Sequence, residues 1–263
     1  MSATGKIVAQ KDGRIGYLIF NNPERHNAMS FDMWVAAAGV LEDFARDGNI
    51  GVVVLTGAGG KAFVSGADIS RFEDERGTQE AVARYGAEVE RVYALVHDFP
   101  KPTIAMIRGY CVGGGLGLAI SCDLRIATEQ SRFAMPAAKL GLGYDLPGIR
   151  RFVEVLGPSF TKEMFFTARQ FDATEALAMG LVNRVKPDAE IEDYVREYAT
   201  TIAANAPLTV ASTKFIIGEL MKDADDRDLA GCTAFVQRCF ESRDYEEGRR
   251  AFMEKRKPVF TGT

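Results

Sequence analysis

The sequence predicts an α/β protein with a helical C-terminal region. Residues 51–56 and 103–108 are mostly apolar, which is typical of parallel strands that are buried on both faces. Between these two segments, apolar residues recur at helical spacing, at Tyr85, Val89, Val92 and Val96. Strands that alternate with helices in this way indicate a parallel sheet covered by helices.

The N-terminal part predicts a hairpin followed by a helix. In residues 5–20, apolar Ile15, Tyr17 and Ile19 alternate with other residues after a turn that ends at Gly13. Ser30 is the expected N-cap of the helix that follows. The apolar face predicted for this helix consists of Phe31, Trp34, Val35, Ala38 and Leu41.

The chain changes character near Pro187, beyond which no strand pattern remains. Two apolar stripes indicate helices there, namely Ile191, Tyr194, Val195, Tyr198 and Ile202, and then Leu229, Cys232, Val236 and Cys239. We therefore predict an α/β core over residues 1–187 and a helical region over residues 188–263. We expect this helical region to pack on itself or on a neighbouring subunit.

Composition narrows the class of protein. With 263 residues and 47% hydrophobic content, the chain can bury a full core, which excludes a disordered or disulfide-stapled protein. The net charge of −4 argues against a broad basic surface for nucleic acid or acidic lipid. No segment resembles a signal peptide or a membrane span, so we expect a cytoplasmic protein. Four cysteines without CxxC spacing and two histidines predict no metal site.

Five segments carry recognisable motifs, and their sequences in order are NPERHNA (22–28), AFVSGADI (62–69), IRGYCVGGG (107–115), AMGLVN (178–183) and FMEKRKP (252–258). Together they resemble the enoyl-CoA hydratase/isomerase, or crotonase, family along essentially the whole chain. The resemblance implies a crotonase-like core of repeated β-β-α units and C-terminal helices that build a trimer or a dimer of trimers. It also implies an acyl-CoA thioester as substrate and no separate cofactor, because coenzyme A is part of that substrate.

The glycine-rich motifs suit the binding of developing negative charge. Glycine lets the backbone approach a ligand closely, and the amides that begin a helix carry a positive dipole. The resemblance implies that the N–H groups of Ala67 and Gly114 form an oxyanion hole for a thioester enolate. In the family the C-terminal helix often reaches a neighbour's site, and the implied coenzyme A contacts are Arg25, Ala28, Ala67, Asp68, Ile69, Ser70, Gly114, Phe252 and Lys255. Asp68 also has the sequence context of a helix cap, with acid–base chemistry as the alternative.

Two positions depart from the pattern of the family's hydratases. Those enzymes carry one glutamate two residues after the triple glycine and a second directly after a later proline, because the addition of water needs proton transfer. Gly117 and Ala137 occupy these positions here. Neither residue can transfer a proton, so the sequence favours decarboxylation or isomerisation over hydration.

The loop 140–147 offers replacements. Tyr144 lies in a G-x-x-Y context similar to that of methylmalonyl-CoA decarboxylases, which the C-terminal half also resembles, although Ala67 stands where those enzymes have a histidine. Asp145 is a candidate general base that carries a proton between two carbons during double-bond migration. The structural alternative is that both residues belong to a solvent-facing turn before Pro147.

Two further functions stay open. One is an enoyl-CoA hydratase whose acid and base have moved to other residues. The other is a chain that binds acyl-CoA, or a protein or RNA partner, without catalysis. Tyr144 and Asp145 discriminate between these classes, because side chains that face the thioester favour catalysis and side chains that face solvent favour binding alone.

Overall fold

The structure, a computed structural model, describes residues 5–71, 75 and 77–263. Its larger sheet has six strands in the order β1-β2-β3-β5-β7-β10. All neighbouring pairs are parallel except the β1–β2 hairpin. The strands are β1 (Ile7–Asp12), β2 (Ile15–Phe20), β3 (Val52–Gly57), β5 (Thr103–Ile107), β7 (Leu124–Thr128) and β10 (Arg184–Lys186).

A second, four-stranded sheet accompanies the first. Its strands are β4 (Ala62–Val64), β6 (Tyr110–Val112), β8 (Arg132–Ala134) and β9 (Phe171–Asp172). The chain passes from a strand of the large sheet to a strand of the small sheet and then to a helix, and it does so three times. The helices that complete these units are α3 (Gln79–His97), α4 (Gly114–Ser121) and α5 (Leu146–Thr167), the last preceded by the 3-10 helix η3 (Pro136–Leu140). This repetition confirms the expected β-β-α architecture.

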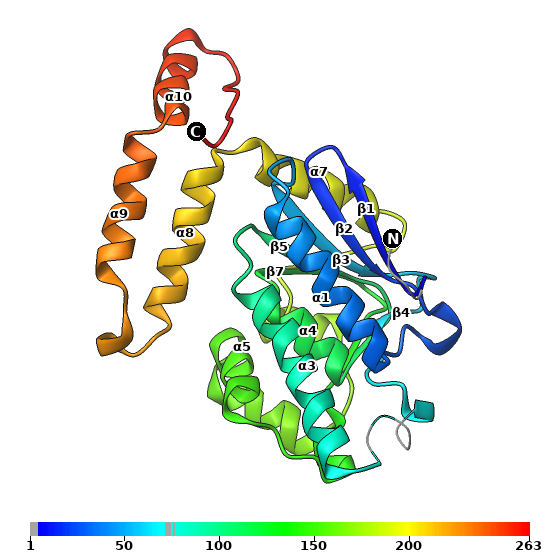
Figure 1. The fold of residues 1–263 in the computed structure, drawn as a ribbon. Coiled ribbons are helices and arrows are strands. Elements are labelled where there is room, and N and C mark those ends of the chain that lie inside the picture. Colours follow the sequence, from blue (N-terminus) through cyan, green and yellow to red (C-terminus); the bar gives the residue numbers. More distant parts are fainter. Residues whose placement is uncertain (1–4, 72–74, 76) are drawn as a thin grey trace.

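Helices cover both faces of the large sheet (Figure 1). α1 (Phe31–Arg46), α3 and α4 pack against one face of the large sheet and enclose the main core. Phe20, Trp34 and Phe63 are fully buried in this core. α7 (Ile191–Ala204) packs on the opposite face through a second apolar cluster. This helix belongs to the region that we expected to pack on itself or on a neighbour, but it covers the sheet because that outer face is apolar and needs burial.

The hairpin and the first helix are confirmed, with one correction to the helix. Asp12 pairs with Ile15 across the hairpin, and α1 begins directly after Ser30, although the Ser30 side chain makes no capping hydrogen bond. Val35 is 43% exposed, whereas Met33 and Ala37 are fully buried. The apolar face of α1 is therefore rotated from the predicted stripe, because its contacts with α3 and the sheet determine which side is covered.

The remaining helices project from the sheets as a tail (Figure 1). They are α8 (Pro207–Leu220), α9 (Leu229–Phe240) and α10 (Arg243–Glu254). α8 and α9 pack against each other, with the rings of Phe215 and Phe235 5.2 Å apart. A salt bridge of 2.8 Å between Lys214 and Asp123 joins α8 to the core. The part of the chain that leaves the sheets thus begins after α7, whereas the domain boundary at residue 187 stays a prediction.

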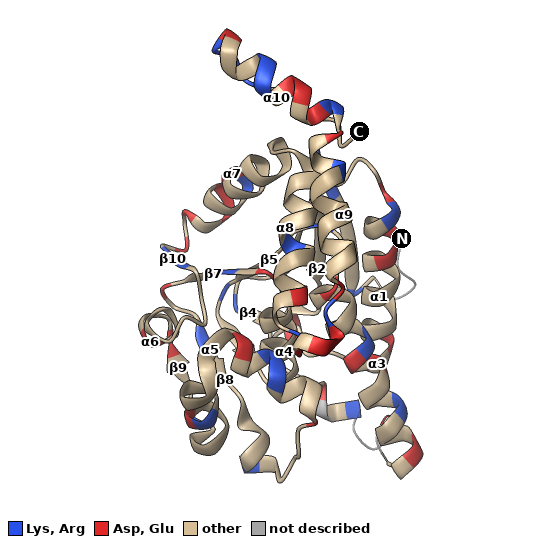
Figure 2. Cartoon of the chain, turned by 90° about the vertical axis from the view of Figure 1, so that its left-hand side faces the viewer, with Lys and Arg blue, Asp and Glu red and all other residues tan. Residues whose placement is uncertain are grey.

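The shorter elements are the 3-10 helices η1 (Pro23–Arg25), η2 (Ile69–Arg71) and η4 (Ala224–Asp226) and the helix α6 (Ala173–Ala178). Lys and Arg share the helices with Asp and Glu, so neither charge dominates the face seen in Figure 2. Among the residues that the structure describes, no helix combines the length and the apolar character that a membrane crossing requires.

Candidate active site

The loops that follow β4 and β6 lie side by side. The two strands pair in parallel, with Val64 opposite Cys111, so both loops leave the small sheet at the same edge. A Cβ atom placed on Gly113 would lie 4.0 Å from the Cα of Gly66. The two glycine motifs, which are far apart in the sequence, therefore meet in space.

Close packing at this point requires glycine. Gly113 has a φ of 55°, a backbone conformation that side chains disfavour. A Cβ atom on Gly115 would lie 2.1 Å from the carbonyl oxygen of Val64, so the first turn of α4 touches the backbone of β4. The N-terminus of α4 is thereby brought next to the loop that contains Ala67.

Two backbone N–H groups at this junction make no hydrogen bond within the described fold. Met29 donates to the carbonyl of Gly66 (2.8 Å) and accepts from the amide of Asp68 (2.9 Å), which leaves the intervening Ala67 amide facing the other way. Gly114 is the first residue of α4, so its N–H has no acceptor within the helix. Within the described part of the chain, neither N–H has a hydrogen-bond partner. Two such donors on adjacent loops suit an anionic oxygen.

The NPERHNA segment is tied to the same region. The side-chain amide of Asn27 donates to the carbonyls of Ala58 (2.9 Å) and Ala62 (2.7 Å) and accepts from the amide of Asn22 (2.9 Å). Asn27 is fully buried, so these bonds replace its contacts with water. This role of Asn27 was not predicted from the sequence, although asparagine tolerates its φ of 56° better than most residues.

Three predicted coenzyme A contacts come together beside this segment. The Arg25 guanidinium donates to Ser70 Oγ (2.6 Å) and lies 3.3 Å from Asp68 Oδ1. Asp68 Oδ1 also accepts from the amide of Ser70 (3.1 Å) and from its hydroxyl (2.7 Å), so Asp68 caps η2 as predicted. Burial by itself would raise the pKa of Asp68, but the Ser70 bonds and the Arg25 charge outweigh it and lower the pKa. Asp68 is thus held as a carboxylate, and its side chain is buried.

The other predicted contacts differ in position. Ala28, which is 9% exposed, precedes Met29 of the bridge to Ala67, and Ile69 begins η2. Phe252 and Lys255 lie at the end of α10, where the Phe252 side chain is 82% exposed. In Figure 1, α10 lies at the opposite end of the molecule from α3 and α5. One chain therefore does not bring Phe252 and Lys255 to the loops around Gly114, and their proposed role requires a neighbouring subunit.

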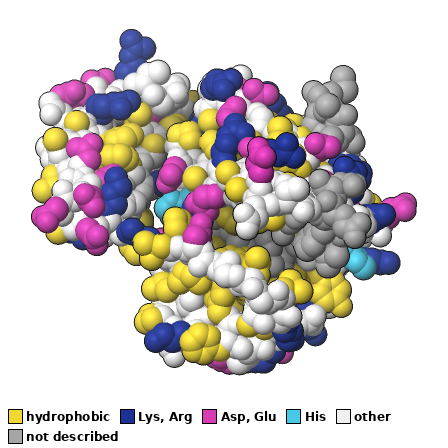
Figure 3. All heavy atoms as spheres, turned by 60° about the horizontal axis from the view of Figure 1, so that its bottom comes forward, with side chains coloured by type: hydrophobic (Ala, Val, Ile, Leu, Met, Phe, Trp, Pro, Cys, Tyr) yellow, Lys and Arg dark blue, Asp and Glu magenta, His cyan; other side chains and the backbone are white. Residues whose placement is uncertain are grey.

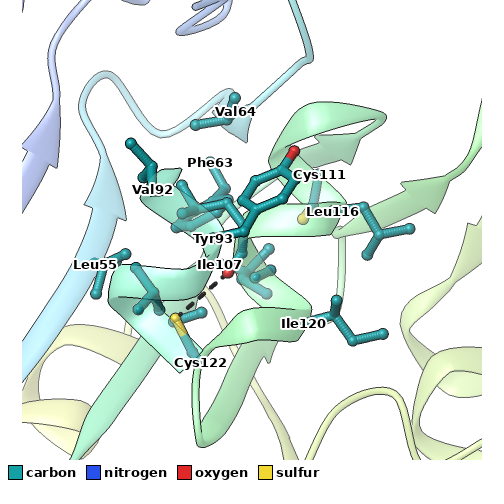
Figure 4. Packing of buried hydrophobic residues seen from close by; sticks show 14 of the residues in the cluster. Leu55, Phe63, Val64, Val92, Tyr93, Ile107, Cys111, Leu116, Ile120 and Cys122 are labelled. Carbon is teal, nitrogen blue, oxygen red and sulfur yellow. Dashed lines mark hydrogen bonds between the residues drawn. The ribbon is translucent and has the colours of Figure 1, made fainter. Parts of the chain in front are cut away.

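A tyrosine fills the space beside Gly117. A Cβ atom on Gly117 would lie 2.7 Å from Oη and 2.8 Å from Cζ of Tyr93 on α3. The Tyr93 hydroxyl donates to the carbonyl of Gly114 at 2.8 Å. Figure 4 shows this ring close to α4, near Leu116 and Cys111. A carboxylate cannot enter at position 117 while Tyr93 keeps this place, and Ala137, the other departure, is also buried. Tyr93 was not predicted as a site residue, although it adjoins Val92 of the predicted apolar stripe.

Tyr144 and Asp145 have different surroundings. Asp145 is exposed and caps α5, where its carboxylate accepts from the amide of Gly148 at 2.9 Å. In the single chain Asp145 therefore matches the solvent-facing alternative rather than a base buried beside an acyl group. Tyr144 is half-buried, with its ring 5.2 Å from that of Phe165. Its phenol adds to the effect of burial in raising the pKa of Tyr93, so Tyr144 lies near that residue.

The buried thiols do not add a nucleophile to the site. The Cys122 thiol donates to the carbonyl of Leu118 at 3.7 Å (Figure 4), and burial raises the pKa of Cys122 to about 12. Burial also raises the pKa of Cys111. Both remain protonated thiols of low reactivity at neutral pH. Among the described residues, no group of three His, Cys, Asp or Glu side chains is placed to hold a metal ion.

Comparison with known proteins places the chain among acyl-CoA enzymes. A family model described as enoyl-CoA hydratase/isomerase matches residues 10–263. The short-chain-enoyl-CoA hydratase of Clostridium acetobutylicum is 35% identical over 251 residues, with 95% of each chain covered. The carnitinyl-CoA dehydratase of Salmonella enteritidis is 32% identical, with 96% of this chain and 97% of the relative covered. The crystal structure of an enoyl-CoA hydratase/carnithine racemase from Magnetospirillum magneticum superposes with a TM-score of 0.94 at 36% identity, covering 98% of this chain and 96% of the other.

Proposed function

Because the chain belongs to the enoyl-CoA hydratase/isomerase family, we propose that it converts acyl-CoA thioesters through an enolate held by the amides of Ala67 and Gly114. The two unpartnered N–H groups on adjacent loops support this proposal. Donors that are fixed before the reaction stabilise the oxyanion without reorganisation, and each typically contributes a few kcal/mol. The Arg25 side chain is half-exposed beside the loop that contains Ala67. It can therefore bind a phosphate of coenzyme A while it keeps its contacts with Asp68 and Ser70.

We propose decarboxylation or isomerisation as the reaction. The observation that carries this proposal is the Tyr93 ring in the space beside Gly117, where a hydratase would place a carboxylate. Decarboxylation breaks a carbon–carbon bond and leaves its electron pair on the enolate, so it needs the oxyanion hole but no pair of carboxylates. Isomerisation needs one group that carries a proton between two carbons. The relatives named hydratase and dehydratase favour the alternative of a hydratase with a relocated acid and base.

A panel of thioesters tests the reaction. We expect crotonyl-CoA to gain water at most marginally, because no carboxylate pair is in place. A 3-enoyl-CoA and a malonyl-type acyl-CoA test isomerisation and decarboxylation, and we expect turnover of at least one of them. Mass spectrometry detects the gain of water or the loss of carbon dioxide, and chromatography detects the isomer. Fast hydration of crotonyl-CoA would contradict the proposal and support the hydratase, whereas tight binding without turnover of any thioester would support a binding protein.

Tyr144 and Asp145 can be tested separately with a reacting thioester. We expect Tyr144→Phe to lower turnover by about 100-fold at unchanged coenzyme A affinity, because a phenol that handles a proton or orients the acyl group is lost. We expect Asp145→Asn to retain turnover, since asparagine is also a good N-cap for α5. Steady-state kinetics and a coenzyme A binding measurement distinguish these effects. Full turnover in Tyr144→Phe would leave Tyr144 with a packing role only.

We also propose assembly into a trimer or a dimer of trimers. Large apolar side chains of the tail are exposed in the single chain, and hydrophobic groups are visible on the face shown in Figure 3. Helices α8, α9 and α10 line a mainly apolar groove of about 990 Å³. The most exposed apolar residues of these three helices are Ile217, Leu220, Leu229, Phe240, Phe252 and Met253. Burial of such a surface favours association.

Light scattering at micromolar concentration tests this proposal, and we expect the mass of three or six chains. Replacing Phe252 and Met253 with serine is expected to weaken the assembly, because their exposed apolar area is removed. Replacing exposed Val82 with serine is a control outside the tail. A monomeric unmodified protein would contradict the proposal.

A further inference from the structure

Tyr93 connects α3 to the first turn of α4. Its side chain is buried, and its hydroxyl donates to the carbonyl of Gly114, the residue that supplies one of the two proposed oxyanion donors. The same hydroxyl lies 3.4 Å from the place where a Cβ atom of Gly114 would be. Tyr93 thus contacts the backbone of the site from the core side.

Neighbouring side chains hold the Tyr93 ring in one orientation. The ring packs edge to face on Trp34, with ring centres 5.7 Å apart. The guanidinium of Arg151 on α5 lies 5.7 Å from the centre of the same ring. Arg151 is in turn held by a two-point ion pair with Glu90, which lies one helical turn before Tyr93 on α3. The hydroxyl therefore reaches Gly114 from a fixed direction.

We propose that Tyr93 is a positioning residue that holds Gly114 in the orientation its N–H needs to bind the thioester oxygen, an inference that rests on the proposed function. Three consecutive glycines carry the donor, and glycine backbone is the most free to rotate. A donor contributes fully only when its direction is fixed before the reaction. The Tyr93 bond to the carbonyl of Gly114 restricts this rotation with a group outside the loop.

The phenol keeps its proton in this position. Burial raises the pKa of Tyr93 well above the ordinary range, and the phenols of Tyr144 and Tyr85 and the carboxylate of Glu90 act in the same direction. Arg151 opposes them without reversing the shift. Tyr93 consequently donates to Gly114 throughout the neutral pH range. A role in positioning therefore predicts that Tyr93→Phe changes the rate but not the shape of its pH profile.

The carbonyl stretching frequency of bound acetyl-CoA, labelled with carbon-13 at the thioester carbonyl, tests the inference. Hydrogen bonds from an oxyanion hole lower this frequency, so the shift reports the donors directly, without turnover. We expect Tyr93→Phe, which keeps the ring, to reduce the shift and broaden the band. With a reacting thioester we expect kcat to fall about tenfold at unchanged KM. Ser121→Ala is the matched control, because it removes another buried hydroxyl that donates to an α4 carbonyl, that of Gly117 at 2.9 Å.

The outcomes separate this inference from the proposed function. Gly114→Pro removes the donor and is expected to lose most of the shift; a normal shift in that variant would overturn the oxyanion hole. A reduced shift in Gly114→Pro with a normal one in Tyr93→Phe would overturn only the role of Tyr93. Equal losses in Tyr93→Phe and Ser121→Ala would mean general loosening of α4 and would also contradict it. Should Tyr93→Phe fail to fold, 3-fluorotyrosine at position 93 keeps the ring and strengthens the donor, and its shift is expected to be at least that of the unmodified protein.

Discussion

Replacing Gly114 with proline is expected to lower turnover by about two to three orders of magnitude, because it deletes one backbone donor to the oxyanion. The fold should tolerate the change. Gly114 is the first residue of α4, where a helix accepts proline since its N–H has no helical partner. The preceding Gly113 has a φ of 55° and a ψ of −117°. This is the mirror image of the extended conformation that a residue before proline prefers, and glycine adopts both forms.

Gly114→Ala is the matched control for this experiment. It keeps the N–H, and its Cβ would meet Tyr93 Oη at 3.4 Å and Trp34 at 3.5 Å, which are ordinary contacts. We therefore expect Gly114→Ala to stay within about tenfold of the unmodified protein, because no donor is lost. Turnover is measured on the thioester that reacts in the panel, and circular dichroism checks the fold. Unchanged turnover in folded Gly114→Pro would exclude this amide from the oxyanion hole.

Introducing the hydratase glutamate at position 117 is expected to destabilise the protein strongly. We expect Gly117→Glu to lower the free energy of unfolding by about 3 kcal/mol or more, since it overpacks the core and buries a charge. The nearest obstacle is the Tyr93 side chain, whose Oη would lie 2.7 Å and whose ring carbon Cζ would lie 2.8 Å from the added Cβ. Trp34 and Arg151 hold this ring in place. Urea unfolding measures the effect.

A double-mutant cycle identifies Tyr93 as the cause. Tyr93→Ala alone is expected to cost about 3–5 kcal/mol through the cavity it leaves. In the double variant Tyr93→Ala/Gly117→Glu, the loss of unfolding free energy should be smaller than the sum of the two single losses by about 2 kcal/mol or more. The reason is that the glutamate enters the space that Tyr93 has vacated. Gly86→Glu is the control, since Gly86 also lies in a helix, α3, but a Cβ there meets nothing within 4 Å. It should be neutral or stabilising by up to about 1 kcal/mol through better helix propensity. Additive losses would contradict the steric explanation.

The elements with a clear period were predictable from the residues. The hairpin has a turn at Gly13 between two short strands, β3 and β5 are mostly apolar runs, and α1 and α3 repeat at helical spacing. The strands β4, β6, β8 and β9 contain only two or three residues each, too few for any period to appear. Pairing with distant strands defines them, so their place in repeated units came from the resemblance to a family.

In the candidate site, too, features that depend on adjacent residues were predictable, and features that depend on contacts between distant residues were not. Gly66, Gly113 and the cap at Asp68 were recognisable locally, because turns and caps depend on a few adjacent residues. The contrast between exposed Asp145 and half-buried Tyr144 was not, since neighbours in the chain differ in burial according to the helices packed over them. Tyr93 beside Gly117 required the packing of α3 on α4, which brings together residues 24 positions apart. A glycine in the sequence indicates only that a side chain is absent. Which other residue fills the space of that absent side chain depends on the three-dimensional packing.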